Sequence, residues 1–173
     1  NTGIEFLIPG LGPTNIPVYL TLLTSMFMHG SWAHLGGNML YLWIFGDNIE
    51  NRLGHKRYII FYLLTGLIAS LSHVFSTVMS TQNSLVPSLG ASGAISGVLG
   101  AYLMMFPGRK VKMFVFRGVI DVPSYVALGF WIALQVISGL GLLGGGGGGG
   151  VAYAAHIGGF IAGLLLIKFF DPL

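Results

Sequence analysis

The sequence predicts an all-α protein, a polytopic bundle of membrane-spanning helices, and three observations lead to this fold class. Of the 173 residues, 54% are hydrophobic and only 8% are charged, which leaves too few polar side chains to cover a soluble domain. The mean hydropathy is +0.81. The apolar residues also gather in five stretches, separated by short segments that hold most of the charges and prolines. We therefore expect the chain to lie in a lipid bilayer.

A helix that crosses a bilayer needs about 20 mainly apolar residues. Five stretches reach or approach this length, and they cover residues 31–49, 58–79, 92–106, 122–143 and 151–170. The apolar run at 18–28 is too short to cross, so we interpret 1–30 as an outer loop with an interfacial helix and 31–173 as the transmembrane core. Seven consecutive glycines at 144–150 predict a mobile outer loop.

The positive charges predict the orientation of these helices. All eight Lys and Arg residues fall at three places in the sequence: Arg52, Lys56 and Arg57; Arg109, Lys110, Lys112 and Arg117; and Lys168. Basic residues accumulate in the cytoplasmic loops of membrane proteins, so these three places belong on the inner side. The distribution indicates a lipid bilayer as partner and not nucleic acid.

Five crossings put the two ends of the chain on opposite sides of the membrane, with the N-terminus outside. Residues 1–30 contain neither the charged segment nor the cleavage site of a signal peptide that would carry this end across. We therefore expect a further span to precede this sequence in the native protein, which would make six.

Four polar side chains are expected at one depth in the membrane. The helices that begin at residues 31, 92 and 151 all run inward in this topology, and close to their starts lie His34, Asn38, Ser92 and His156. His34 and Asn38 are four residues apart and share one helix face. Ionisable side chains at membrane depth are rare and functional by default, so these four residues form the candidate site.

Small residues predict that two of these helices touch. They recur at intervals of four, at Gly93, Gly97 and Ala101 in one helix and at Ala155, Gly159 and Gly163 in the other. Such stripes let membrane helices pack backbone to backbone. Because Gly93 follows Ser92 and Ala155 precedes His156, we expect this packing to bring the hydroxyl and the imidazole within hydrogen-bond reach.

A hydroxyl beside an imidazole indicates acyl-transfer chemistry. A neutral His156 can take the proton of Ser92 as the serine oxygen attacks a carbonyl, and can then give it to the leaving amine. The free amides at the start of the Ser92 helix, together with His34 and Asn38, are the candidate donors to the oxyanion. We expect a dyad without an acid, because only Glu5 maps to the outer side, whereas the other acids map to the inner side: Asp47, Glu50, Asp121 and Asp171.

Other classes of protein fit the sequence less well. A zinc protease would want His-Glu-x-x-His on one helix, a pattern that the sequence lacks, and an aspartyl enzyme would need two acids within the membrane. The chain has no cysteine, which excludes a thiol nucleophile and thiolate metal sites. A transporter would favour internal repeats, and none is convincing here. We expect no metal and no other cofactor.

Taken together, His34-x-x-x-Asn38, Gly90-x-Ser92-Gly93 and Ala155-His156-x-x-Gly159 resemble the rhomboid family of intramembrane serine proteases. The resemblance extends from about Phe27 to the C-terminus and includes His29 and Glu50-x-Arg52-x-Gly54. It implies a rhomboid-like catalytic core with Ser92 as nucleophile, His156 as general base, and His34, Asn38 and the Ser92 amide as oxyanion stabilisers. It also implies cleavage of transmembrane segments of membrane proteins, without a cofactor. As the default location we expect a plasma or inner membrane.

Two features depart from the family. Members usually have a core of six helices, whose first helix is missing here, and many carry an aromatic residue four positions after the nucleophile, where this chain has Ser96. A serine in a membrane helix commonly bonds to the backbone carbonyl four residues before it, and we interpret Ser96 in this way. The alternative function is a non-catalytic rhomboid-like protein that binds client transmembrane helices without cutting them.

Overall fold

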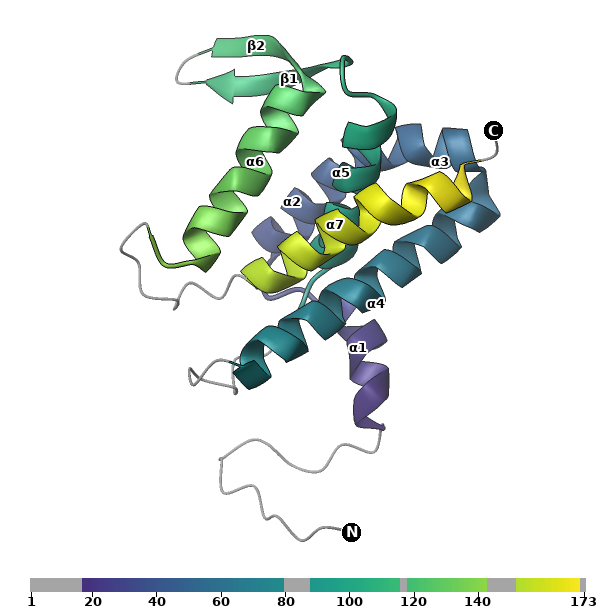
Figure 1. Ribbon diagram of the computed structural model, residues 1–173, viewed down its shortest axis with the longest axis vertical. Helices are drawn as coiled ribbons and strands as arrows, with labels where there is room; N and C mark the ends of the chain where they lie inside the picture. The colour runs from purple at the N-terminus through teal and green to yellow at the C-terminus, as the bar shows by residue number, and fades with distance from the viewer. Residues whose placement is uncertain (1–16, 80–87, 116–117, 143–151, 172–173) are drawn as a thin grey trace, which may run out of the picture.

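A computed structural model of the protein describes residues 17–79, 88–115, 118–142 and 152–171, and most of these residues are helical (Figure 1). The helical elements are η1 (Val18–Leu20), α1 (Thr21–Thr24), η2 (Ser25–Phe27), α2 (Trp32–Tyr41), η3 (Leu42–Gly46), α3 (Asp47–Leu53), α4 (His55–Met79), α5 (Ser92–Met105), α6 (Ser124–Gly139) and α7 (Tyr153–Phe170). Two strands, β1 (Lys110–Val115) and β2 (Gly118–Pro123), lie between α5 and α6.

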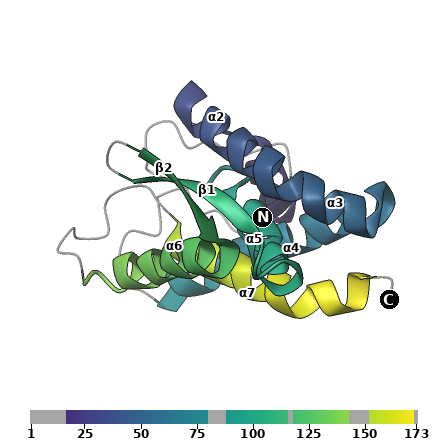
Figure 2. The same ribbon diagram turned by 90° about the horizontal axis from the view of Figure 1, so that it is seen from above.

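α5 is the central helix of the bundle. Every residue from Ala94 to Tyr102 is buried, as expected for a helix that is apolar on all its faces. It packs most extensively on α7 and α4, and it also contacts η3 and α6. Figure 2 shows α5 between α2 and α3 on one side and α6 and α7 on the other.

A helix occupies each of the five predicted apolar stretches. Two of them are long and apolar enough to cross a membrane, α4 with 25 residues and α7 with 18. The apolar helices α5 and α6 have 14 and 16 residues. The first stretch stays helical from Trp32 to Leu53, through the π-helical turn of η3, and so runs four residues past its predicted end at residue 49.

The prediction of an all-α protein is wrong in one segment. Residues 107–121, which connect the third and fourth predicted helices on the inner side, contain most of an antiparallel hairpin in which Lys110 pairs with Pro123 and Val115 pairs with Gly118. Val111 is buried, whereas Lys112 points outward and its ammonium lies 3.3 Å from the Asp121 carboxylate. This alternation of apolar and polar residues is the signal of a half-buried strand.

The fourth helix is shorter than predicted, because the hairpin takes its first residues. α6 begins at Ser124, not at residue 122, and ends at Gly139, not at 143. The Ser124 hydroxyl is fully buried and lies 2.5 Å from the carbonyl oxygen of Phe106 and 2.9 Å from that of Pro107. These hydrogen bonds fix the start of α6 to the end of α5.

The described part of the predicted outer loop packs on α4. It forms helical turns from Val18 to Phe27, in which the Leu22 carbonyl accepts a hydrogen bond of 3.1 Å from Ser70 of α4. The Ser25 carbonyl accepts another, of 2.9 Å, from the amide of Gly90. Residues 1–16 and the glycine run at 144–150 lie outside the described residues.

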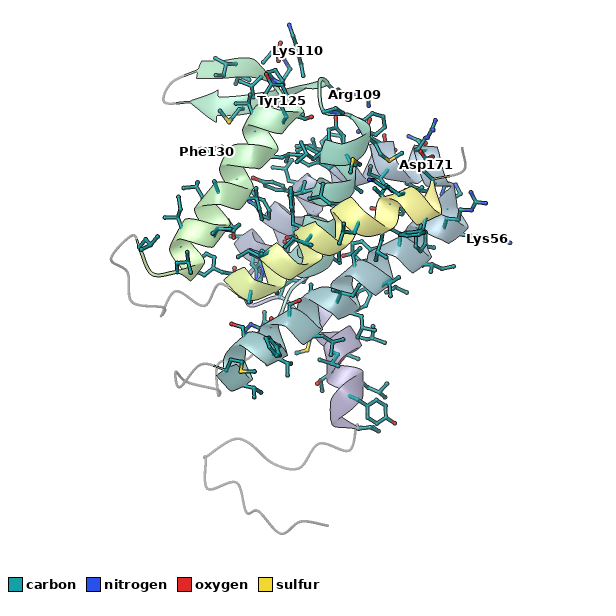
Figure 3. The ribbon with its side chains drawn as sticks, in the orientation of Figure 1. Lys56, Arg109, Lys110, Tyr125, Phe130 and Asp171 are labelled. Atoms are coloured by element: carbon teal, nitrogen blue, oxygen red, sulfur yellow. The ribbon has the colours of Figure 1, made fainter. Side chains whose placement is uncertain are left out.

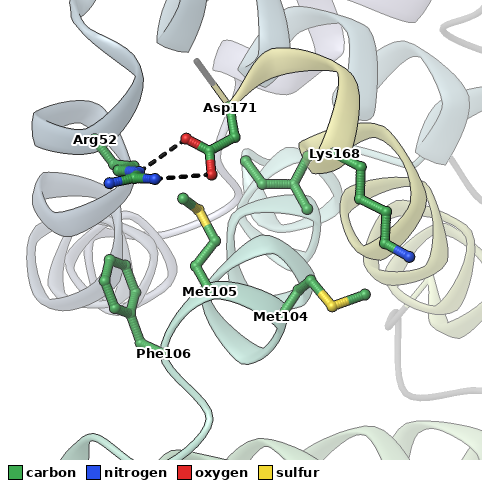
Figure 4. Close-up of a pocket in the computed structure, with 7 residues that line it drawn as sticks. Arg52, Met104, Met105, Phe106, Lys168 and Asp171 are labelled. Carbon is green, nitrogen blue, oxygen red and sulfur yellow. Dashed lines mark hydrogen bonds and ion pairs between the residues drawn. The ribbon is translucent and has the colours of Figure 1, made fainter. Parts of the chain in front are cut away.

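Charged side chains gather at one end of the bundle, where Figure 3 shows Lys56, Arg109, Lys110 and Asp171. Arg52, in the last turn of α3, contacts the carboxylate of Asp171 just after α7, with N–O distances of 2.8 and 3.2 Å. This hydrogen bond, and then the charge of Asp171, raises the pKa of Arg52. Figure 4 shows the pair among the residues that line a pocket of about 320 Å³.

Gly54 separates α3 from α4, and its backbone conformation explains why Glu50-x-Arg52-x-Gly54 has a glycine at this position. Its φ of 78° and ψ of 154° lie in a region that essentially only glycine adopts. A Cβ at this position would meet nothing within 4 Å. The requirement for glycine therefore comes from the backbone alone.

Candidate active site

Ser92 is the first residue of α5, and the structure explains why the positions around it are glycines. Gly90 has a φ of +114°, which side chains of L-residues rarely allow, and a Cβ there would lie 2.8 Å from the ring of His34. A Cβ at Gly93 would lie 2.8 Å from the Cβ of Ala69 on α4. The motif thus lets the chain turn beside His34 and begin a helix that lies tightly against α4.

α5 and α7 pack backbone to backbone, so the prediction from the small-residue stripes is confirmed. A Cβ at Gly159 would collide with the carbonyl group of Gly93, and a Cβ at Gly163 would collide with that of Gly97. From the opposite side, a Cβ at Gly100 would collide with the carbonyl oxygen of Phe160. The two helices therefore touch without intervening side chains.

This packing brings Ser92 and His156 together. Ser92 Oγ lies 2.8 Å from His156 Nε2, within the range of about 2.6–3.2 Å that joins a serine nucleophile to its base. His156 lies in the first turn of α7, where its amide bonds to the carbonyl of Ala152 at 3.1 Å. Both side chains are half-buried.

A third side chain contacts the imidazole, and the sequence did not predict it. Oε1 of Gln135, on α6, lies 2.7 Å from His156 Nδ1. The expected dyad excluded a third, acidic member, and Gln135 is a neutral amide. The signal in the sequence was a long polar side chain between Leu134 and Val136, in the middle of an otherwise apolar stretch.

An aromatic ring lies near His156 although Ser96 replaces the aromatic residue that many rhomboids carry. The ring is that of Trp131 on α6, whose centre lies 5.9 Å from the centre of the imidazole. Ser96 is fully buried, and its hydroxyl donates a 2.6 Å hydrogen bond to the carbonyl of Ser92. The interpretation of Ser96 as a residue that bonds to its own helix is therefore confirmed.

His34 and Asn38 lie on α2, beside the turn that precedes Ser92. Ser31 caps this helix by accepting a 3.1 Å hydrogen bond from the amide of His34. A Cβ at Gly90 would lie 2.8 Å from Nε2 of His34 and 3.5 Å from Nδ2 of Asn38. Nδ2 of Asn38 is buried, without a hydrogen-bond partner among the described residues.

His29 adjoins this pair. Its ring centre lies 5.1 Å from that of His34, in an edge-to-face arrangement. Its Nε2 is also buried and lacks a hydrogen-bond partner within the described part of the chain. Beside the start of α5, two buried nitrogen atoms, His29 Nε2 and Asn38 Nδ2, thus lie without hydrogen-bond partners among the described residues.

The start of α5 supplies backbone donors. Its first intrahelical bond runs from the amide of Ile95 to the carbonyl of Ala91, at 3.0 Å, and Ala91 has no side chain that caps the helix. The amides of residues 92–94 therefore lack intrahelical acceptors, as in any helix start. Among the described residues, no three His, Cys, Asp or Glu side chains gather as metal ligands would.

Comparisons with known proteins match residues 17–171 to the rhomboid domain. The chain is 35% identical over 147 residues to the mitochondrial Rhomboid protein 1 of Saccharomyces cerevisiae, covering 84% of this chain and 40% of that protein. It is 36% identical over 151 residues to the mitochondrial Presenilin-associated rhomboid-like protein A of Danio rerio, covering 87% and 37%. It is 39% identical over 136 residues to the Rhomboid protease GluP of Bacillus subtilis, covering 78% and 25%.

The chain spans less than half the length of each of these three relatives. The range matched to the rhomboid domain nevertheless includes every described residue, and all four predicted site residues lie within it: His34, Asn38, Ser92 and His156. The chain belongs to the rhomboid family.

Proposed function

We propose that this rhomboid chain is an intramembrane serine endopeptidase that cuts transmembrane segments of membrane proteins, with Ser92 as the nucleophile and His156 as the general base. The 2.8 Å contact between Ser92 Oγ and His156 Nε2 carries the proposal. One relative that is 39% identical is named a protease, the Rhomboid protease GluP, which supports the same class of reaction.

The reaction has two halves. Ser92 Oγ attacks the carbonyl carbon of the peptide bond while its proton passes to His156 Nε2, and the imidazolium then protonates the leaving amine, so that an acyl-serine remains. In the second half, a water molecule gives a proton to the same imidazole and attacks the acyl-serine. The imidazolium then gives this proton to Ser92 Oγ as the carboxylic acid product leaves, and the product ionises to the carboxylate by losing its remaining proton to water.

The oxyanion that forms on the carbonyl needs hydrogen-bond donors already in place, and we assign this role to the Ser92 amide, His34 and Asn38. Asn38 supports the assignment because its buried Nδ2 has no acceptor among the described residues. Leaving such a donor unpaired costs about 1–3 kcal/mol. An oxyanion bound beside Gly90 would supply the acceptor that this donor lacks.

The proposed enzyme is a multi-pass protein of a plasma or inner membrane, with residues 1–30 as an outer loop and an interfacial helix. Its five spans are α2 with α3, α4, α5, α6 and α7, and the charged end faces inward. In this topology Ser92 lies near the outer end of its span, where a substrate helix would unwind to expose a peptide bond. Two of the relatives are named as mitochondrial proteins. The proposed reaction uses no cofactor.

Cleavage of a reporter transmembrane helix by the chain reconstituted in liposomes tests the proposal. The wild type should release two fragments, and Ser92→Ala should release none while keeping its helical circular dichroism. Ser96→Ala is the matched control, because this serine lies one turn further along α5 and bonds to the Ser92 carbonyl, and it should still cut. Retained cleavage by Ser92→Ala would refute the proposal.

The same assay addresses the alternative of a non-catalytic client binder. That function predicts a wild type that captures the reporter helix and releases no fragments. In that case Ser92→Ala should capture it equally well.

A further inference from the structure

We propose that Gln135 of α6 is a positioning residue, which holds His156 in the tautomer that a general base requires. The inference rests on the proposed function, because it assigns a role within the same site. Its basis is one juxtaposition: Gln135 Oε1 lies 2.7 Å from His156 Nδ1, while Nε2 of the same ring lies 2.8 Å from Ser92 Oγ.

The hydrogen-bonding capacity of each atom determines the tautomer. An amide oxygen only accepts hydrogen bonds, so the ring nitrogen that faces Gln135 must carry the proton. In a neutral imidazole the other nitrogen then holds a lone pair. That nitrogen is Nε2, which faces Ser92, and the serine hydroxyl donates to it. Of the two neutral tautomers, Gln135 thus selects the one that can accept the serine proton.

The same face of α6 also places an aromatic ring beside the imidazole of His156. Trp131 precedes Gln135 by four residues, so both side chains leave α6 on one face. Its ring lies 5.9 Å from the imidazole at an angle of 36°, and 6.0 Å from the ring of Phe160 on α7. Gln135 therefore contacts the imidazole at Nδ1, and the ring of Trp131 lies beside it in a tilted arrangement.

An amide suits this position better than an acid does. The imidazole and Gln135 are both partly buried among apolar helices, where an additional carboxylate would lose hydration. When the serine proton arrives at Nε2, Nδ1 keeps donating to Oε1, so the pair needs no rearrangement. Papain-like enzymes use the same solution, an amide beside the catalytic histidine.

A pair of substitutions separates positioning from packing. Gln135→Met keeps the length and removes the acceptor, whereas Gln135→Glu keeps an acceptor and introduces a charge into an apolar setting. Positioning predicts that Gln135→Met lowers kcat by about 10- to 100-fold, the loss that removing the hydrogen-bond partner of a metal-bound histidine typically causes, with little change in KM. It also predicts that Gln135→Glu restores most of kcat.

A packing role predicts the opposite order, with Gln135→Met active and Gln135→Glu impaired, and that order would overturn the inference. Val136→Met is the matched control, because Val136 is the next residue of α6 and is exposed, and it should cut like the wild type. Thermal unfolding of each variant identifies one that fails to fold.

A spectroscopic measurement tests the inference without any turnover. In ¹⁵N spectra of the wild type, the imidazole of His156 should be neutral with its proton on Nδ1. In Gln135→Met, the same imidazole should shift toward a mixture of the two neutral tautomers. Unchanged spectra in Gln135→Met would overturn the inference even if the wild type cuts its reporter. Conversely, suppose that the wild type never cuts its reporter but that Gln135→Met still shifts the tautomers. That result would refute the proposed protease activity and support the contact between Gln135 and His156.

Discussion

Gly163 on α7 packs directly against the carbonyl group of Gly97 on α5, without a side chain between the two backbones. One turn earlier along each helix, Gly159 packs in the same way against the carbonyl group of Gly93. Ser92 directly precedes Gly93 and His156 lies three residues before Gly159, so their side chains meet beside this contact. The distance between the proposed nucleophile and its base is therefore a property of helix packing. Changes far from the chemistry should move it.

Gly163→Ala should lower both stability and turnover. The added methyl group would collide with backbone, which cannot rotate away as a side chain can, and overpacking of this kind costs about 1–3 kcal/mol. The matched control is Gly129→Ala on α6, where a Cβ meets nothing within 4 Å. Thermal unfolding and reporter cleavage measure the two effects, and a Gly163→Ala variant as stable and active as the control would contradict the packing.

Asn38→Ala should cut about 10²- to 10³-fold more slowly, the usual loss when one oxyanion donor is removed. Its stability should not fall through a lost hydrogen bond, because the buried Nδ2 makes none to the described residues and is already an unpaired donor in the wild type. Asn51→Ala, on the exposed side of α3, is the control and should cut normally. Equal turnover in both variants would remove Asn38 from the oxyanion site.

Gly90→Ala should impair catalysis through His34. An alanine there must adopt a φ of +114°, and its Cβ would lie 2.8 Å from the His34 ring, so either the turn or the ring must shift. Reporter cleavage should fall by at least tenfold, since one donor is worth about 10² or more. Gly36→Ala, where a Cβ has open space, should be neutral, and full activity in Gly90→Ala would contradict this account of the motif.

Arg52→Met should destabilise the fold while leaving the chemistry of the folded fraction intact. Arg52 joins the end of α3 to the end of α7 through Asp171, at the end of the bundle opposite to Ser92. Lys168→Met, in the same pocket (Figure 4), controls for the loss of a positive charge. A lower unfolding temperature with unchanged kcat per folded molecule is expected, and a lower kcat would link the ion pair to the site instead.

Much of the site was predictable because it follows short-range rules. A few consecutive residues are enough to identify His156, the glycines Gly90 and Gly93 around Ser92, and the stripes of small residues. The stripes alone identify which two helices touch. Ser96 was predictable for the same reason, since its hydrogen bond closes within a single turn of α5.

The contacts that the sequence did not reveal depend on how α6 is placed. Gln135 and Trp131 reach His156 only because α6 lies beside α7, and neither carries a charge that marks it as functional. The hairpin was missed for a different reason: Arg109, Lys110, Lys112 and Arg117 indicated an inner loop, and the alternation of Val111 with Lys112 was weak beside that signal.

Labelling by a fluorophosphonate, with the modified residue identified by mass spectrometry, tests the central claim most directly, because it needs no knowledge of the substrate. The wild type in liposomes should be labelled at Ser92, and His156→Ala should lose the label although Ser92 is still present. A wild type that stays unlabelled, or a His156→Ala variant labelled at the wild-type rate, would contradict the activation of Ser92 by His156.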